Sequence, residues 1–212
     1  MAKRQYLYFP FMSEWERRTA TLDHPDYVVA IGASAGGLAA IKDLIAMLPS
    51  DLDAPIVIAV HSEPASKLTE VLKQASALSI KKVEDCEELK KGWIYIVPGA
   101  THAFFRNGKV HLSELVRNSG FRPSIDALFI TLAAEYGDRA IAVVLSGALK
   151  DGMRGAQVIY DMGGQTIVQD PQEAEFAGMP NSVIFGDNQE TVLSAAKLGV
   201  WLRDLIGQST PG

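Results

Sequence analysis

Hydrophobic runs of strand length alternate with segments of helical period along most of the chain. Apolar residues fill Tyr27–Ile31 and Pro55–Val60 almost without a break, whereas Leu38–Leu48 and Ser66–Ala77 show helical spacing. A short uninterrupted apolar run is typical of a strand in a parallel sheet that helices cover on both faces. This order therefore predicts βαβ units whose two strands lie in the centre of the sheet.

The alternation continues towards the C-terminus after one interruption. The predicted elements are strands at Trp93–Val97, Ala140–Leu145 and Gln165–Gln169, and helices at Ser124–Tyr136, at about Asp151–Met162 and near Gln189–Leu205. The interruption is Ala103–Arg106 and Lys109–Ser113 around Asn107-Gly108, a dipeptide typical of hairpin turns. The sequence thus predicts a doubly wound α/β fold: a mostly parallel sheet with helices on both faces and an inserted antiparallel hairpin.

The chain is predicted to form one core. Its 212 residues suit a single α/β domain. Residues 1–26 follow neither period and are predicted to be an N-terminal tail, residues 27–206 the domain, and residues 207–212 a C-terminal tail. The charged run Glu84–Lys91 is predicted to be a solvated turn.

Composition and charge exclude several classes of function. With 48% hydrophobic residues the chain can bury a core, and its net charge of -5 opposes nucleic-acid binding. The single cysteine, Cys86, is expected to be a packed side chain and fits a reducing, cytoplasmic compartment. No apolar run approaches the length of a membrane span, so no membrane insertion is expected. No residues show metal-ligand spacing, and we expect neither a metal nor another cofactor.

A glycine-rich segment, Gly32–Gly37, follows the first strand, at the sheet edge where ligands of this fold class bind. One interpretation is a phosphate-binding loop, but the glycine spacing differs from Gly-x-Gly-x-x-Gly, and His61 rather than an acid follows the second strand. The other is a nucleophile elbow that exposes Ser34 on a strained turn. Ser34 could instead simply cap the following helix.

Two further strand ends favour the nucleophile. Neighbouring parallel strands lie about 5 Å apart, so His61 can reach Ser34. Asp151 follows the strand Ala140–Leu145 and could orient His61 or cap the helix after it. A hydroxyl, an imidazole and a carboxylate at one sheet edge are the nucleophile, base and orienting group of acyl transfer.

These residues resemble the catalytic domain of CheB-type protein-glutamate methylesterases, which demethylate bacterial chemoreceptors. The resemblance covers about residues 27–206. It rests on short motifs in chain order: Ile31-Gly32-Ala33-Ser34-x-Gly36-Gly37, Val60-His61-x-x-Pro64, Val97-Pro98-Gly99 with His102, Arg122-Pro123-Ser124-Ile125-Asp126, Leu145-Ser146-Gly147, Asp151-Gly152 and Gly178-Met179-Pro180.

The resemblance implies that Ser34 is the nucleophile, His61 the general base and Asp151 its partner. It also implies a substrate: γ-glutamyl methyl esters on the cytoplasmic helices of chemoreceptors, with methanol released, and receptor glutamines that the same site could deamidate. Members controlled by phosphorylation carry a receiver domain in front of the catalytic domain, and the predicted tail, residues 1–26, is too short for such a domain. We therefore expect a stand-alone enzyme, either constitutively active or controlled by a regulatory partner in trans.

Other residues near the motifs receive lesser roles. Backbone N–H groups near Ala148 and Ala35 are the candidates for stabilising an oxyanion. His102 and Arg122 are candidates for the rim of the substrate site, and Arg122 could meet Asp126 at the cleft mouth or form an anchoring ion pair with it. Two alternatives remain open at this point: a nucleotide-binding module of the same fold, and an inactive adaptor that only binds receptors.

Overall fold

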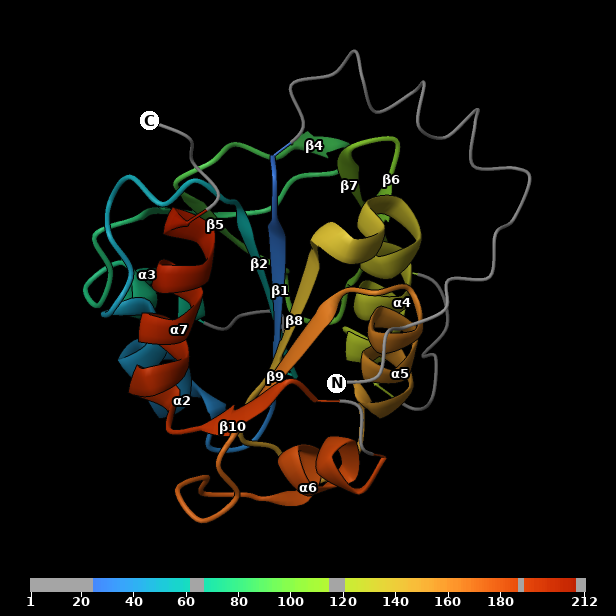
Figure 1. Cartoon of the computed structure of the whole chain (residues 1–212). Helices are drawn as coiled ribbons and strands as arrows, with labels where there is room; N and C mark the ends of the chain where they lie inside the picture. Colours follow the sequence, from blue (N-terminus) through green and yellow to red (C-terminus); the bar gives the residue numbers. More distant parts are fainter. Residues whose placement is uncertain (1–24, 62–66, 115–120, 187–188, 209–212) are drawn as a thin grey trace.

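The main feature of the computed structural model is a parallel sheet in the centre of the molecule (Figure 1). The structure describes residues 25–61, 67–114, 121–186 and 189–208. Within these residues the sheet has seven strands, all parallel. In spatial order they are β10 (Thr191–Leu193), β9 (Gln165–Gln169), β8 (Ala140–Val144), β1 (Val28–Ala33), β2 (Ile56–Val60), β5 (Trp93–Ile96) and β3 (Ser79–Lys82).

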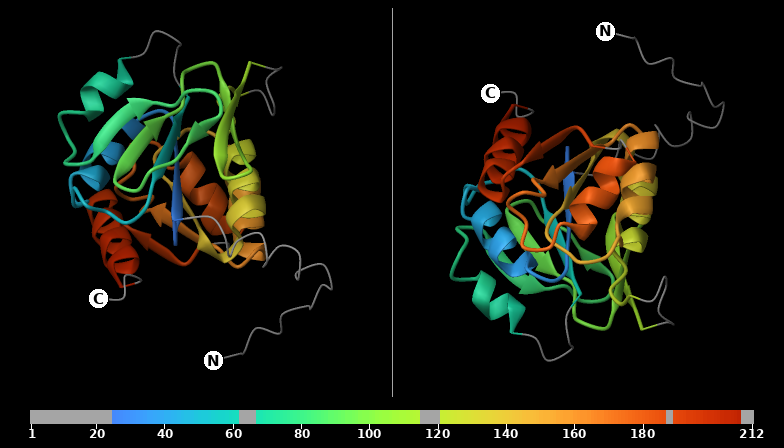
Figure 2. Two further views of the ribbon diagram at one scale, coloured as in Figure 1. Left: turned by 90° about the horizontal axis from the view of Figure 1, so that it is seen from above. Right: turned by 90° about the horizontal axis from the view of Figure 1, so that it is seen from below.

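Helices cover both faces of this sheet (Figures 1 and 2). One face is covered by α2 (Gly37–Ile45), α3 (Leu68–Leu72) and α7 (Ala195–Gly207), the other by α4 (Ile125–Tyr136), α5 (Met153–Asp161) and α6 (Gly178–Phe185). A short 3-10 helix, Gly137–Arg139, joins α4 to β8. Side chains of β1 alternate between the two cores: Val29 and Ile31 join one, Val28 and Ala30 the other. The central strand is therefore buried on both sides.

A separate antiparallel sheet packs beside α4. Its strands are β4 (Glu87–Glu88), β6 (His102–Arg106) and β7 (Lys109–Ser113), in the order β4-β7-β6. Asn107 and Gly108 at the tip of the β6–β7 hairpin both have positive φ, 53° and 70°, as a two-residue type I′ turn requires. Phe105 and Val110 of the hairpin share a core with Phe129 of α4.

The predicted fold class and the hairpin are confirmed, but several elements differ. The terminal helix predicted near Gln189–Leu205 is present, but its predicted start is wrong: Thr191–Leu193 adds an edge strand, and α7 begins at Ala195. Helix α6 was not predicted, because Gly178 and Pro180 are poor helix residues in general. Here they occupy its first turn, where proline is tolerated. Strand β3 was also missed, since only Ile80 of its four residues is buried.

Two predictions about the surface need correction, and two predicted segments lie wholly or partly outside the described residues. Part of the run Glu84–Lys91, predicted to be a turn, forms β4. Cys86, predicted to be packed, is exposed. Nearly all of the predicted N-terminal tail, residues 1–24, lies outside the described residues, and so does the start of the predicted helix Ser66–Ala77.

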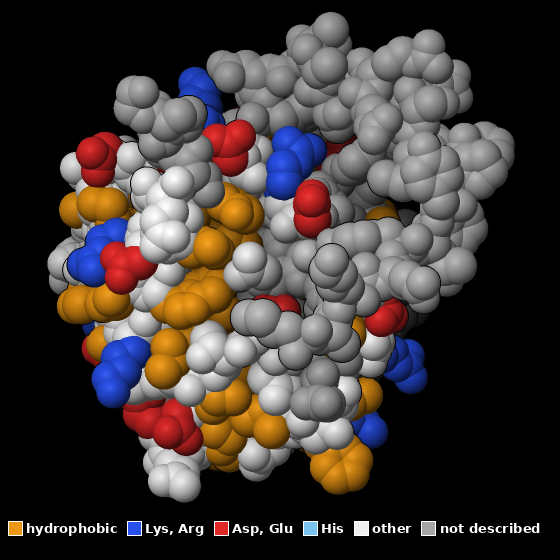
Figure 3. Space-filling model, viewed as in Figure 1, with side chains coloured by type: hydrophobic (Ala, Val, Ile, Leu, Met, Phe, Trp, Pro, Cys, Tyr) orange, Lys and Arg blue, Asp and Glu red, His pale blue; other side chains and the backbone are white. Residues whose placement is uncertain are grey.

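The surface carries charges of both signs. On the face viewed in Figure 3, Lys and Arg side chains are scattered among Asp and Glu, with hydrophobic side chains between them. None of the described helices is long and apolar enough to cross a membrane.

The contact between α7 and α2 predicts the effect of a methyl group. A Cβ on Gly199 would overlap the carbonyl oxygen of Leu44 and lie 2.9 Å from Cβ of Met47. Gly199→Ala should therefore lower the free energy of unfolding by about 1–3 kcal/mol in urea denaturation. Gly207→Ala, in the same helix with no atom within 4 Å, should change it by less than about 0.5 kcal/mol. Equal effects of the two substitutions would contradict this packing.

Candidate functional site

Three adjacent strands bring the predicted site together. Strand β1 lies between β8 and β2, so the loops that follow these strands meet at one edge of the sheet. The sheet hydrogen bonding continues into the loops: the backbone N–H of Ser34 donates to Ser146 O at 2.9 Å, and that of His61 donates to Ala33 O at 3.2 Å. The backbones that carry Ser34 and His61 are thus fixed by the sheet.

Ser34 lies on the tight turn from β1 into α2. The left-handed residue of this turn is Gly36, with φ 71°, so the strained position of the predicted elbow falls on Gly36 and not on Ser34. A Cβ on Gly36 would also lie 2.7 Å from Ser146 Oγ. The capping role considered for Ser34 is not seen, because the N-cap of α2 is Gly36 and no side chain caps it.

His61 links the two other side chains. Its Nδ1 lies 3.1 Å from Ser34 Oγ, and its Nε2 lies 2.8 Å from Asp151 Oδ2. The imidazole also stacks on the ring of Phe121, with 4.6 Å between centroids and 5° between planes. The stack and the hydrogen bond to Asp151 together hold the plane of the ring and leave Nδ1 directed at the hydroxyl.

The Asp151 carboxylate is buried at the N-terminus of α4. Its Oδ2 accepts a second hydrogen bond, from the backbone N–H of Ile125 at 2.8 Å, and its Oδ1 accepts from Asp126 N–H at 3.0 Å. Asp151 was considered as a cap for the helix that follows it, but α5 has Gly152 as its N-cap and no side-chain cap. The carboxylate instead binds a helix N-terminus from elsewhere in the chain, where the helix dipole favours negative charge.

Asp126 returns the same interaction from α4 to α5. Its Oδ1 accepts from the backbone N–H groups of Gly152 and Gly155, each at 2.9 Å. Burial raises the pKa of Asp126 and the nearby Asp151 charge raises it further, against the opposing effect of the backbone hydrogen bonds. The two helices are therefore joined by two carboxylates, each of which binds backbone N–H groups at the start of the other helix.

These distances define the tautomer that the site favours. A carboxylate can only accept, so His61 Nε2 must carry the proton that it donates to Asp151. Nδ1 then has a free lone pair and accepts the hydrogen bond from the Ser34 hydroxyl. The arrangement can remove a proton from Ser34 while the carboxylate stabilises the imidazolium that results.

Ser146 fixes the loop that carries Ser34 to the loop before α6. Its buried hydroxyl donates to Ala35 O at 2.8 Å and accepts from the backbone N–H of Phe176 at 3.0 Å. Its own N–H donates to Gln169 Oε1 at 2.9 Å. Three loops at the edge of the sheet are thus held in one arrangement.

A cavity of about 380 Å³ opens beside the Ser34 hydroxyl. It lies between the start of α2 and the loop before α6, and its lining includes Leu38, Lys42, Val60 and Glu175. Ser34 itself is part of the wall. A side chain that enters this cavity would lie beside Ser34.

The two candidate oxyanion donors lie on exposed loops at this edge. Within the described part of the chain, no group accepts a hydrogen bond from the backbone N–H of Ala35 or of Ala148. Both residues are exposed. Their N–H groups are therefore available to a ligand.

His102 does not lie on the substrate rim predicted for it, and Arg122 does not meet Asp126. His102 is 2% exposed, and its Nδ1 accepts from the backbone N–H of Ser124, the N-cap of α4, so it lies beneath the site. Arg122 Nη1 donates to Glu114 O at 2.9 Å. The expected meeting of Arg122 with Asp126 does not occur, because Asp126 faces the start of α5.

Comparison with known proteins agrees with this geometry. The family model for CheB methylesterase matches residues 29–202, which include Ser34, His61 and Asp151, together called the relay below. The chain belongs to the CheB methylesterase family. The crystal structure of the Thermotoga maritima CheB methylesterase catalytic domain superimposes with a TM-score of 0.81 at 36% sequence identity, covering 84% of this chain and 98% of that one.

Relatives of the CheB family from other organisms extend the match. The Thermotoga maritima protein-glutamate methylesterase/protein-glutamine glutaminase is 36% identical over 185 residues, which are 84% of this chain and 54% of the relative. A Leptospira interrogans protein to which the same two activities are provisionally assigned is 38% identical over 173 residues, which are 80% of this chain and 90% of the relative. The nucleotide-binding alternative has no support from these comparisons.

Sequence reasoning missed two residues that shape this CheB-family site. Phe121 stacks on His61, but nothing in its position in the sequence distinguishes it from other aromatic residues. Ser146 was quoted only as part of a motif, although its hydroxyl ties the Ser34 loop to Phe176. A polar residue directly after the buried strand β8 was the available signal for Ser146.

The raised pKa of Asp126 predicts how stability depends on pH. A carboxyl with a raised pKa in the folded state stabilises the fold most below its unfolded pKa, about 4, and this contribution is lost as pH rises through the folded pKa. Asp126→Asn keeps an acceptor for Gly152 and Gly155 but does not titrate. The unfolding free energy of the wild type relative to this variant should therefore fall as pH rises from about 4 to neutrality. A difference that rises with pH in urea denaturation would contradict the raised pKa.

Proposed function

We propose that this chain is a protein-glutamate methylesterase in which Ser34 is the nucleophile, His61 the general base and Asp151 its orienting partner. The observation that carries the proposal is the relay itself, with 3.1 Å between Ser34 Oγ and His61 Nδ1 and 2.8 Å between His61 Nε2 and Asp151 Oδ2. Family membership supports the substrate class, since the relatives are named as methylesterases and glutaminases.

In the acylation step, Ser34 Oγ attacks the γ-carbonyl carbon of the methyl ester. The hydroxyl proton passes to His61 Nδ1, while the Nε2 proton stays hydrogen-bonded to Asp151. The tetrahedral intermediate then collapses, the bond to the methoxy oxygen breaks, and Nδ1 returns its proton to the departing methanol.

Hydrolysis of the acyl-enzyme uses the same atoms. Water takes the place of methanol, gives a proton to His61 Nδ1 and attacks the acyl carbon, and Ser34 Oγ leaves with that proton. The product is a receptor glutamate. A glutamine side chain would follow the same course with ammonia as the leaving group, in keeping with the glutaminase activity in the relatives' names.

The negative charge that develops on the carbonyl oxygen requires fixed donors. The backbone N–H groups of Ala35 and Ala148 support this role because no described group accepts from them. In comparable hydrolases one such donor is worth about 10²- to 10³-fold in rate.

Exposed hydrophobic side chains beside the relay fit a receptor helix. Leu38, Leu149 and Phe176 are 40%, 58% and 40% exposed, and they lie on the segments that follow β1, β8 and β9. The apolar stripe of an amphipathic helix could dock on such side chains while one glutamyl methyl ester enters the cavity beside Ser34.

The exposed thiol of Cys86 fits the cytoplasmic location that this substrate requires.

Substitution of the nucleophile tests the proposal. Ser34→Ala should lower methanol release from a methylated chemoreceptor by roughly 10⁴- to 10⁶-fold and abolish labelling by a fluorophosphonate probe. Ser79→Ala, which changes an exposed serine on the edge strand β3, should retain both. An adaptor would release no methanol and take no label in either form, and that result would overturn the proposal.

Substitution of the carboxylate should affect catalysis and stability together. Asp151→Asn places an NH₂ group either against the N–H of Asp126 or against the donors from His61 and Ile125, so one interaction becomes repulsive. We expect methanol release to fall by about 10⁴-fold, as in other serine hydrolases, and the unfolding free energy to fall by about 1–3 kcal/mol. Full activity with lowered stability would show that Asp151 serves only the helix.

A further inference from the structure

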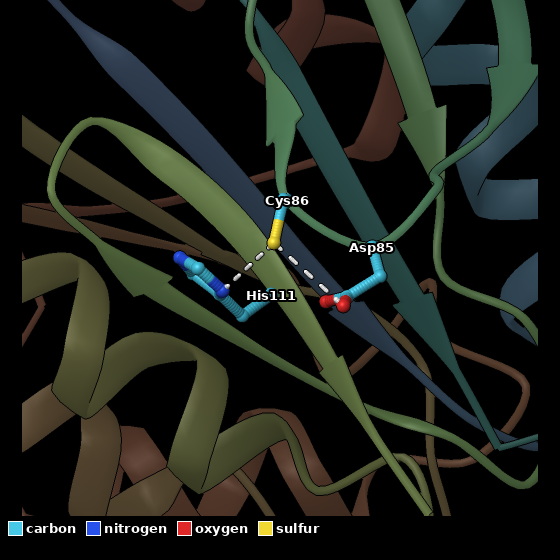
Figure 4. A group of neighbouring side chains, drawn as sticks. All are labelled: Asp85, Cys86 and His111. Atoms are coloured by element: carbon cyan, nitrogen blue, oxygen red, sulfur yellow. Dashed lines mark hydrogen bonds between the residues drawn. The ribbon is translucent and has the colours of Figure 1, made fainter.

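Three side chains of different chemistry converge on the second sheet. Asp85 and Cys86 directly precede β4, and His111 lies on β7, which pairs with β4. Figure 4 shows the three side chains directed at one another: Cys86 Sγ lies 3.5 Å from His111 Nδ1 and 3.7 Å from Asp85 Oδ2. One donor atom from each residue lies within 4.8 Å of the other two.

These separations suit one tetrahedral metal ion. Zinc binds sulfur at about 2.3 Å and imidazole nitrogen or carboxylate oxygen at about 2.0–2.2 Å. At tetrahedral angles such bonds hold a sulfur and a nitrogen or oxygen about 3.5–3.7 Å apart. The two distances from Cys86 Sγ, 3.5 and 3.7 Å, match this geometry, and the donor oxygen and nitrogen lie within 4.8 Å of each other.

Hydrogen bonds on the far side of two residues orient the donors. His111 Nε2 lies 3.3 Å from Arg106 O, a contact in which the nitrogen donates, so Nδ1 is left with its lone pair directed at Cys86. Asp85 Oδ1 accepts from Leu112 N–H at 2.8 Å, which leaves Oδ2 on the side of the thiol. Metal ligands are commonly held in this way by a second hydrogen bond.

The backbone at Cys86 is also unusual. Its φ is 60°, a left-handed conformation that a cysteine adopts only when its surroundings hold it there. This conformation occurs at the residue that places the thiol between Asp85 and His111. The distances between the donor atoms are the main support for a site, and this conformation agrees with them.

We propose that Asp85, Cys86 and His111 bind one zinc ion. Thiolate, imidazole and carboxylate are all zinc ligands, and the mixture suits zinc better than magnesium or calcium, which prefer oxygen alone. The thiol proton leaves to solvent as the zinc–sulfur bond forms, and the fourth position is filled by water or by a donor from a partner. Strand β4 and helix α6 lie at opposite ends of the molecule in Figure 1, so this site is separate from the relay.

Cobalt reports directly on the thiolate, because Cys86 is the only cysteine in the chain. The full chain, prepared without a polyhistidine tag, would be titrated with Co²⁺ and followed by the sulfur-to-cobalt charge-transfer absorption. We expect one Co²⁺ per chain and complete loss of the band on adding Zn²⁺. Cys86→Ser should abolish the band, and His111→Gln and Asp85→Asn should each weaken Zn²⁺ binding at least about tenfold.

Glu88→Gln, which changes an exposed acid on β4, is the matched control and should bind Zn²⁺ like the wild type. Circular dichroism checks that each variant is folded. Absence of the band in the wild type would overturn the proposal. Unchanged Zn²⁺ affinity in both His111→Gln and Asp85→Asn would also overturn it, because the thiol of Cys86 would then bind the metal without the other two residues. The measurement does not involve ester hydrolysis, so its outcome is independent of the proposed enzyme activity.

Discussion

The Asp151 carboxylate is the group on which the site depends most. It receives hydrogen bonds from the imidazole of His61 and from the first two backbone N–H groups of α4. A buried carboxylate is unfavourable without such partners, and the N-terminus of a helix provides both hydrogen bonds and a favourable dipole. The carboxylate that binds the N-terminus of α4 therefore also orients the proposed catalytic base.

The packing of α4 on α5 makes this arrangement reciprocal. Asp126 binds the start of α5 while Asp151, just before α5, binds the start of α4. A Cβ on Gly155 would lie 2.5 Å from Cβ of Phe129, so the close approach of the helices requires a glycine there. The loop after β8 is held by backbone and side-chain contacts at both ends. Its residue Asp151 can therefore keep the imidazole of His61 in one tautomer without help from a substrate.

The sequence was sufficient for the outline of the site because of a general property of parallel sheets. Ser34, His61 and Asp151 each follow an apolar strand, and loops after adjacent parallel strands gather at one edge. The details depended on contacts between distant segments, which the pattern of apolar residues does not encode. The placement of His102 beneath the site, the stacking of Phe121 and the helix that Asp151 caps all depend on how α4 sits against the sheet. The terminal segment was misread for a related reason: residues 191–193 add to the exposed edge of β9, and only that neighbour makes them a strand.

The orientation of the imidazole is the feature that the proposed chemistry needs most. The proposed proton transfer requires the proton of neutral His61 to lie on Nε2, facing Asp151, with Nδ1 unprotonated and facing Ser34. Nitrogen-15 NMR of the histidine-labelled protein distinguishes the two ring nitrogens, and the spectrum of His61→Gln assigns the His61 signals among the four histidines of the chain. We expect a single tautomer with Nε2–H that persists in the absence of substrate. An Nδ1–H tautomer, or equal populations of both, would contradict it.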